Sequence, residues 1–284
     1  MKETKSKLIL VHSGNFFPKY LNDCIELALR QNLDIHLLLS KDLHKYVNHN
    51  INIEILEDYQ DEKFVNFKHT YLPESFNDGF FNRTSSRFFI ISNYAKSKAL
   101  ESFFHIENDI AIFSDLISTR LAIEKTKNNI MLVMDCDNRS VPSIMWFKDH
   151  SSARSLSDYI FSNNNFTDME NLGNYFNQNS DIVGNFPLVP FDYFKSEIRL
   201  DNMFEDFNQI FDGCAIGQYL FGIDPIHHKH PNENSVGFIN KTSLFTPSKL
   251  NIIWKNKAPF LLANNIEIPI INLHMHCKDF SKLI

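Results

Sequence analysis

Apolar residues recur along the chain in short continuous runs that alternate with helix-like stretches. Lys7 to Val11 (KLILV) reads as a buried strand, His12 to Asn15 as a polar loop, and Pro18 to Arg30 as an amphipathic helix with the proline near its first turn. A second apolar run of strand length covers Asp34 to Leu39. This order predicts two parallel strands joined by a right-handed crossover, the opening of an α/β sheet.

The pattern continues as an alternation of strands and helices. Strands are expected at Ile51 to Leu56, near Thr70, and at Phe103 to Ile106, Asn129 to Met134, Leu250 to Trp254 and Ile266 to Leu273. Helices are expected at Ser85 to Ser102, Leu116 to Lys125, Ser151 to Ser162 and Thr167 to Asn177, and from Asp212 through Leu220. Two stretches, Val183 to Phe194 and Gly222 to Asn234, read as loops.

These elements predict one α/β domain with a mixed sheet flanked by helices over residues 1–284. No repeat, low-complexity tract or linker divides it. Within the domain, a nucleotide-binding part is expected at about 1–135 and an acceptor-binding part at about 136–284.

Composition narrows the class of protein. A net charge of -6 and the lack of a Lys/Arg cluster argue against a nucleic-acid partner. The four cysteines are scattered, which is typical of reduced thiols in a cytosolic protein. No apolar run has the length of a signal peptide or a membrane span. We therefore expect a cytoplasmic protein, with at most peripheral association with the inner membrane face.

Two acids and an amide, Glu107-Asn108-Asp109, follow the short strand at Phe103 to Ile106. Ligands of α/β sheets bind at the carboxyl ends of the strands. Carboxylates two residues apart on an extended segment point to the same side and supply the hard oxygen ligands that a divalent cation prefers. The triplet is a candidate metal site, and an ordinary acidic turn is its alternative.

A second cluster closes the last apolar run, where His274-Met275-His276 is followed by Lys278. Imidazole is a ligand of Zn²⁺ and is accepted by Mn²⁺, and the lysine is suited to a phosphate. Strand spacing places both histidines on one face, although one of them could simply fill a polar pocket.

Three ordered blocks, RFFIISNYAKSKALESFFHIEND, FDGCAIGQYLFGIDP and INLHMHCK, resemble those of glycosyltransferases of the GT-A fold group. The chain is most similar to bacterial and viral sugar transferases with a strand that ends in His-x-Glu-x-Asp-like residues. The resemblance implies transfer of a sugar from a nucleotide diphosphate sugar, with Mn²⁺ or Mg²⁺ as cofactor. This sequence departs from the usual acid-x-acid motif of the family because Glu107 stands in place of the first aspartate.

The resemblance also implies roles for individual residues. Asp109 is the expected metal ligand, completed by His276 or, as the alternative, His274. Glu107 and Asn108 are expected near the ribose, and Lys278 near the phosphates. The loop that lines the nucleotide consists of His12, Ser13, Gly14 and Asn15. Arg87 either neutralises the donor diphosphate or is a solvated charge at a helix start.

The main candidate on the acceptor side is Asp212, which is expected to lie at the start of a helix. An inverting transferase needs a carboxylate to take the proton of the acceptor hydroxyl. Asp212 is our candidate base, with a simple helix cap as its alternative and Asp135 and Asp137 as rival acids. Gln218 and Asp224 are candidate acceptor contacts. Three histidines of the predicted loop at Gly222 to Asn234 resemble a metal cluster, but a flexible lid or a solvated surface is the favoured interpretation: His227, His228 and His230.

The sequence therefore favours a metal-dependent glycosyltransferase, inverting, that acts on a glycan or glycolipid acceptor in polysaccharide biosynthesis. Two alternatives stay open. One is a metal-dependent hydrolase that uses the same acids and histidines. The other is a sugar- or nucleotide-binding protein without catalysis.

Overall fold

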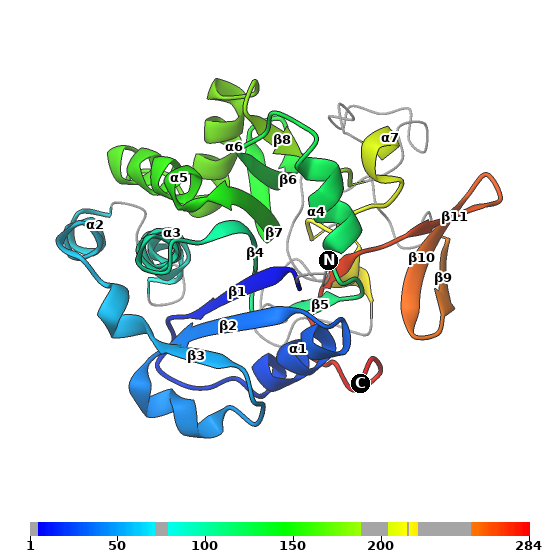
Figure 1. Ribbon diagram of the computed structural model, residues 1–284, viewed down its shortest axis with the longest axis horizontal. Helices are drawn as coiled ribbons and strands as arrows, with labels where there is room; N and C mark the ends of the chain where they lie inside the picture. The colour runs from blue at the N-terminus through cyan, green and yellow to red at the C-terminus, as the bar shows by residue number, and fades with distance from the viewer. Residues whose placement is uncertain (1–4, 72–78, 189–203, 215, 221–250) are drawn as a thin grey trace, which may run out of the picture.

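A seven-stranded sheet forms the centre of the molecule, with the strand order β3-β2-β1-β4-β7-β6-β8 (Figure 1). The computed structural model describes residues 5–71, 79–188, 204–214, 216–220 and 251–284. The strands of the sheet are β1 (Lys7–His12), β2 (Asp34–Leu39), β3 (Asn52–Ile55), β4 (Glu101–Ile106), β6 (Ile130–Cys136), β7 (Arg139–Asp149) and β8 (Val183–Asn185). Strands β1 to β4 are mutually parallel, and β7 runs antiparallel to β4 and β6. The predicted α/β class with a mixed sheet is confirmed.

Helices cover both faces of this sheet. They are α1 (Lys19–Arg30), α2 (Glu62–Thr70), α3 (Phe80–Ser97), α4 (Ile117–Ile123), α5 (His150–Ser162), α6 (Asp168–Gln178) and the short α7 (Phe204–Phe207). Shorter 3₁₀ turns are η1 (Lys41–Tyr46), η2 (Leu56–Tyr59) and η3 (Gly217–Tyr219). In the described part of the chain, no helix combines the length and the apolar character that a bilayer crossing requires.

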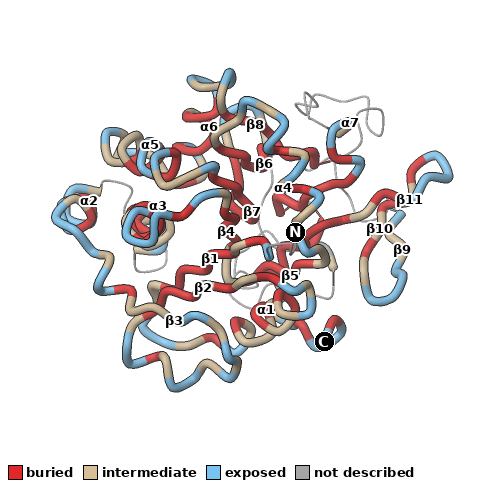
Figure 2. Tube along the Cα trace, in the orientation of Figure 1, coloured by how far each residue is buried: buried red, intermediate tan, exposed pale blue. Residues whose placement is uncertain are grey.

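Two apolar cores lie on opposite faces of the sheet, and Figure 2 shows the buried backbone concentrated along its strands. Alternate residues of β1 supply both cores: Leu8 and Leu10 pack toward α1 and α4, and Ile9 and Val11 pack toward α2, α3, α5 and α6. A strand with both faces buried reads as a continuous apolar run, which is why β1 was recognisable in the sequence.

Two smaller sheets are built largely from the last described part of the chain. Strand β5 (Ile110–Ile112) pairs with β12 (Asn272–His274). Strands β9 (Ile252–Lys255), β10 (Ala258–Ala263) and β11 (Ile266–Pro269) form a three-stranded antiparallel sheet that projects from the body at the right of Figure 1. The predicted strand at Ile266 to Leu273 is therefore two strands, because β11 and β12 belong to different sheets.

Several predicted elements differ from the structure. The strand near Thr70 is wrong: that residue ends α2, whose N-cap Asp61 accepts a hydrogen bond from the Phe64 amide. The helix expected over Ser85 to Ser102 is α3, which ends at Ser97 before Ala99 adopts a positive φ of 46°. Pro18 is the N-cap of α1 and lies one residue before its first turn.

Three further differences concern the second half of the sheet. Strand β7 was not predicted, and it supplies the central antiparallel strand beside β4. The loop expected from Val183 begins instead with β8, which pairs with β6 and forms an edge strand of the sheet. The helix expected to open at Asp212 is absent from the described residues, where only the short turn η3 forms.

Candidate metal site at the end of strand β4

The acidic triplet occupies the turn between β4 and β5, at the carboxyl end of a central parallel strand. Strand β1 lies beside β4 in parallel and ends at His12, so the loops that follow the two strands meet. The Asn108 side-chain amide donates a hydrogen bond to Nδ1 of His12 over 3.1 Å. The structure thus brings the predicted nucleotide loop and the triplet together.

The imidazole of His12, the hydrogen-bond partner of Asn108, is neutral and is held in place from both of its ring nitrogens. Burial lowers its pKa, against the opposing effect of the Phe16 carbonyl. Its Nε2 donates to that carbonyl over 2.7 Å, which leaves Nδ1 as the acceptor for Asn108. A side chain at Gly14 would meet the imidazole, because a Cβ there would lie 2.9 Å from Cε1 of His12. The neighbouring Ser13 is half-buried and Asn15 is exposed in the same loop.

The pairing of β12 with β5 places His274 beside the carboxylates of Glu107 and Asp109. Strand β12 lies antiparallel to β5 with His274 opposite Ile110, the residue after Asp109. The Met275 amide donates to the Asp109 carbonyl over 2.9 Å and fixes this register. As a result, Nε2 of His274 lies 3.3 Å from Asp109 Oδ1 and 3.7 Å from Glu107 Oε2.

Asp109 is a buried carboxylate with two cationic partners. Its Oδ2 forms an ion pair with the Lys278 ammonium, and its Oδ1 faces His274. Burial raises the pKa of Asp109, but Lys278 and His274 outweigh that effect and hold it well below the ordinary value. Burial likewise lowers the pKa of His274, yet the Asp109 charge raises it well above the ordinary value. The two charges stabilise each other.

Arg87 lies in the interior of α3 and is only 7% exposed, so the expectation of a solvated charge at a helix start is wrong. Its two terminal nitrogens contact Glu107 Oε1 at 2.7 Å and Asp168 Oδ2 at 2.8 Å. Asp168 is the first residue of α6, and burial raises its pKa against the lowering effect of Arg87. Arg87 therefore ties Glu107 to the helical layer.

The donor set fits a hard divalent cation. One ligand atom each from Glu107, Asp109 and His274 lies within 4.8 Å of the others. Two carboxylates and one imidazole suit Mn²⁺ or Mg²⁺ better than a thiophilic metal. The geometry favours His274, the alternative histidine of the sequence analysis, over His276 as the partner of Asp109.

His276 instead faces a cysteine. Its Nε2 lies 3.0 Å from Sγ of Cys214, and the two histidine rings are in edge contact at 4.6 Å between centroids. Both His276 and Cys214 are buried. The placement of the two histidines on one side agrees with the prediction, but Cys214 was not recognised because its partners lie about sixty residues away in the sequence.

Asp212 is fully buried and binds backbone groups. Its carboxylate accepts hydrogen bonds from the amides of Ile216 at 2.9 Å, Gly217 at 2.7 Å and His274 at 2.8 Å. The backbone amide of Asp212 donates to the side-chain oxygen of Asn272, and the backbone carbonyl of Asp212 accepts from the side-chain nitrogen of Asn272. This geometry argues against the role of catalytic base: the carboxylate fastens the 212–217 segment to β12.

The other predicted residues separate into two groups. Gln218 is fully buried, and neither atom of its side-chain amide has a hydrogen-bond partner among the described residues. The rival acid Asp137 is exposed in the turn after β6, and Asp135 lies within β6. The remaining candidates lie outside the described residues: Asp224, His227, His228 and His230.

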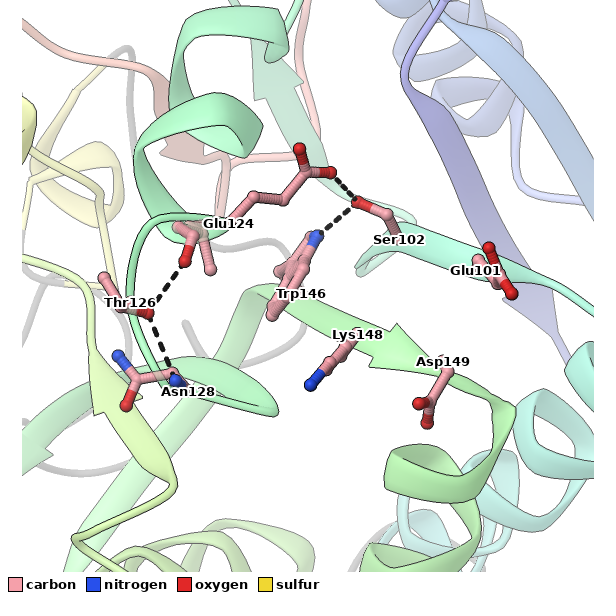
Figure 3. A pocket seen from close by; sticks show the side chains of 9 residues that line it. Glu101, Ser102, Glu124, Thr126, Asn128, Trp146, Lys148 and Asp149 are labelled. Carbon is pink, nitrogen blue, oxygen red and sulfur yellow. Dashed lines mark hydrogen bonds between the residues drawn. The ribbon is translucent and has the colours of Figure 1, made fainter.

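A cavity of about 370 Å³ lies at the opposite, amino-terminal end of β4 (Figure 3). There the Trp146 indole donates to Ser102 Oγ at 3.2 Å, and Ser102 in turn donates to Glu124 at 2.9 Å. Lys148 lines the same cavity. The cavity lies at the opposite end of β4 from the triplet, and both hydrogen-bond partners of the Ser102 hydroxyl come from its own wall.

No protein-family model matches the chain, and no curated protein matches it. Among solved structures, it is similar to mouse xyloside xylosyltransferase 1 in its apo form, with 8% identity and a TM-score of 0.46 over 65% of this chain and 86% of that one. It is also similar to the galactosyltransferase LgtC in complex with donor and acceptor sugar analogs, with 13% identity and a TM-score of 0.44 over 71% and 82%.

A third similar structure is the apo-form glycosyltransferase GlyE of Streptococcus pneumoniae, with 12% identity and a TM-score of 0.37 over 63% of this chain and 44% of that one. At these identities and TM-scores, none of the three structures assigns a chemistry to the residues of this chain.

Proposed function

We propose that the chain is a glycosyltransferase that takes its donor, a nucleotide diphosphate sugar, at the turn between β4 and β5. The observation that carries the proposal is the buried cluster of Glu107, Asp109, His274 and Lys278 at the carboxyl end of a parallel strand. Such an edge is where α/β sheets bind ligands, and a diphosphate leaving group needs concentrated positive charge.

Glu107, Asp109 and His274 would hold a Mn²⁺ or Mg²⁺ ion. The ion would stabilise the negative charge that grows on the departing diphosphate. Lys278 lies at the same carboxylate and adds a fixed ammonium where phosphate oxygens would arrive. Arg87 keeps Glu107 turned toward the cluster from the helical side.

The loop after β1 supplies the nucleotide contacts in this proposal. His12 and Asn108 form a preformed polar pair beside the triplet, suited to ribose hydroxyls. Phe16, which the sequence analysis did not single out, is 72% exposed in the same loop and offers a face for stacking on a base. In this proposal the base and ribose contacts fall within the predicted nucleotide-binding part, residues 1–135, a boundary that lies inside strand β6, while His274 and Lys278 join the site from the second part of the chain.

Gln218 is our candidate for the sugar hydroxyls. A buried amide without partners is costly unless a ligand completes its hydrogen bonds. Gln218 follows Gly217, which packs so closely on β12 that a Cβ there would lie 2.5 Å from the His274 carbonyl. The amide therefore belongs to the segment that lies against the metal cluster. The acceptor remains a glycan or glycolipid in this proposal; with Asp212 engaged by backbone amides, we assign no base and no inverting course.

The test is a thermal-shift panel of nucleoside diphosphates with and without Mn²⁺, on the full chain and on Asp109→Asn. A ligand of the folded state at a hundredfold excess over its Kd adds roughly 2.7 kcal/mol of apparent stability. We expect a Mn²⁺-dependent shift for at least one nucleotide in the parent and none in the variant. A panel without any shift would reject the proposal, and metal-dependent phosphoester hydrolysis without nucleotide binding would favour a hydrolase.

A further inference from the structure

A second set of metal-ligating side chains lies beside the carboxylate cluster and has different chemistry. Cys214, His274 and His276 each offer one ligand atom, and these atoms lie within 4.8 Å of one another. All three residues are buried. A thiolate with two imidazoles is a donor set for Zn²⁺, whereas Mn²⁺ and Mg²⁺ prefer oxygen.

The backbone around Cys214 is held in a conformation that places its sulfur beside His276. Cys214 has a φ of 70°, in the left-handed region that residues other than glycine rarely adopt. The preceding Gly213 packs on β6, where a Cβ would lie 2.6 Å from Cγ1 of Val133. Asp212 anchors the same segment to the His274 amide over 2.8 Å. One carboxylate therefore fixes the cysteine loop against the strand that carries the histidines.

The second ring nitrogen of His274 points to a ligand. Nε2 faces the carboxylates of Asp109 and Glu107, while Nδ1 is buried without a hydrogen-bond partner among the described residues. Histidines that bind zinc through one nitrogen commonly donate the other N–H to a carboxylate, which orients the ring. Asp109, at 3.3 Å from Nε2, stands in that position.

We propose that Cys214, His274 and His276 bind a Zn²⁺ ion behind the donor site. The cysteine binds as its thiolate and the histidines as neutral imidazoles, so binding releases to solvent the thiol proton of Cys214 and the Nδ1 proton that His274 carries as the cationic partner of Asp109. Zinc–ligand bond lengths of about 2.0–2.3 Å place sulfur and nitrogen roughly 3.5 Å apart in a tetrahedral site. The observed Cys214–His276 contact of 3.0 Å needs only a small widening. The ion would lock the 212–217 segment onto β12 and hold His274 toward Asp109. With zinc on Nδ1, Nε2–H of His274 donates to Asp109, so Glu107 and Asp109 would then hold the donor-site cation without His274 as a ligand.

The experiment uses the metal-stripped full chain and Co²⁺ as a spectroscopic probe, followed by displacement with Zn²⁺. We expect one equivalent of Co²⁺ with tetrahedral d–d bands and a thiolate charge-transfer band, both lost when Zn²⁺ is added. Zn²⁺ at a hundredfold excess over its Kd should raise Tm by roughly 5 °C.

Cys214→Ser should abolish the charge-transfer band and weaken Zn²⁺ binding at least about 100-fold, and His276→Gln should weaken it similarly. Cys277→Ser is the matched control: this thiol adjoins His276 in sequence but is only half-buried and lies outside the cluster. Circular dichroism establishes that each variant is folded. A band that is absent from the parent, or that survives in Cys214→Ser, would overturn the proposal.

Asp109→Asn separates this site from the donor site. It should remove Mn²⁺-dependent nucleotide binding but keep the cobalt–thiolate band, with Zn²⁺ affinity reduced by about 10–100-fold because His274 loses its orienting carboxylate. Loss of nucleotide binding in this variant with the band retained would support two separate sites. A parent chain that shows the band but binds no nucleotide would support the zinc site alone, and a parent without the band would reject the zinc site while leaving the donor site to its own test.

Discussion

The two ends of strand β4 differ in how their polar groups are partnered. At the amino-terminal end, Ser102, Glu124 and Trp146 line an open cavity and form a short chain of hydrogen bonds that ends on the partly exposed Glu124 carboxylate. At the carboxyl end, about 20 Å away for a strand of this length, charged side chains are buried against one another. The larger cavity lies at the first region and the buried charges lie at the second, and our proposed site is the one with the buried charges.

The largest expected effect tests how far the buried charges depend on each other. Replacement of Arg87 by methionine removes the cation shared by Glu107 and Asp168. Breaking a buried ion pair in this way costs about 3–5 kcal/mol. Urea unfolding should show that loss in Arg87→Met. Asp168→Asn, which keeps Arg87 paired with Glu107, should cost clearly less; equal stability of Arg87→Met and the parent would contradict the prediction.

The next effect concerns turnover at the carboxyl end. Asp109→Asn removes the negative charge that Lys278 and His274 face, and with it a ligand of the proposed cation. Loss of a group that stabilises charge in the transition state typically lowers the rate by about 10²–10³-fold. The rate of sugar transfer with Mn²⁺ measures this effect, and near-parent turnover would separate the triplet from catalysis.

A third test uses pH and the buried histidine of β4. His105 is fully buried, and its Nδ1 donates to the Ile9 carbonyl at 3.0 Å. Burial, and then the Arg87 charge, lower its pKa to about 3. The unfolded chain takes up this proton below about pH 6.5, so between these values it binds more protons than the folded chain. Stability should therefore fall as the pH decreases, by at most about 1.4 kcal/mol per unit.

Unfolding free energies between pH 6.5 and 4.5, above the range of ordinary carboxylates, check this slope. His105→Phe should be less stable at neutral pH, because a hydrogen bond is lost, but its stability should depend less on pH in this window. A slope identical to that of the parent would show that another group is responsible.

The smallest effect is expected at the amino-terminal end. Glu124→Gln keeps an acceptor for Ser102 Oγ and removes only a charge at the cavity rim. We expect a change in unfolding free energy within about 0.5 kcal/mol and unchanged transfer activity. A large loss of transfer in this variant would reverse the comparison and make the cavity the functional region.

The same contrast explains what the sequence could reveal. The triplet was recognisable because a short, largely apolar run, Phe103 to Ile106, precedes it, and strands with both faces buried have this signature. Gly14 and the loop after β1 followed from the same strand–loop–helix order. Each of these features is local, because the residues that reveal it lie close together in the sequence.

The partners of the triplet are not local. Arg87 reaches Asp168 across 81 residues, and the order of β4, β7 and β6 in the sheet decides that contact. The choice between His274 and His276 depends on the register of β12 against β5. Asp212 reads as a helix cap in sequence, because aspartate prefers that position, but tertiary hydrogen bonds to Gly217 and His274 override the local preference.

The pairing of β12 with β5 also sets the order in which the site can be assembled during synthesis. Asp109 and Lys278 are 169 residues apart, so a growing chain carries the acidic turn long before its ammonium partner is made. Contacts of such separation form late, since the loop they close must first be ordered. The nascent protein can therefore complete most of its central sheet first, and the proposed site is complete only when the strand carrying His274 docks.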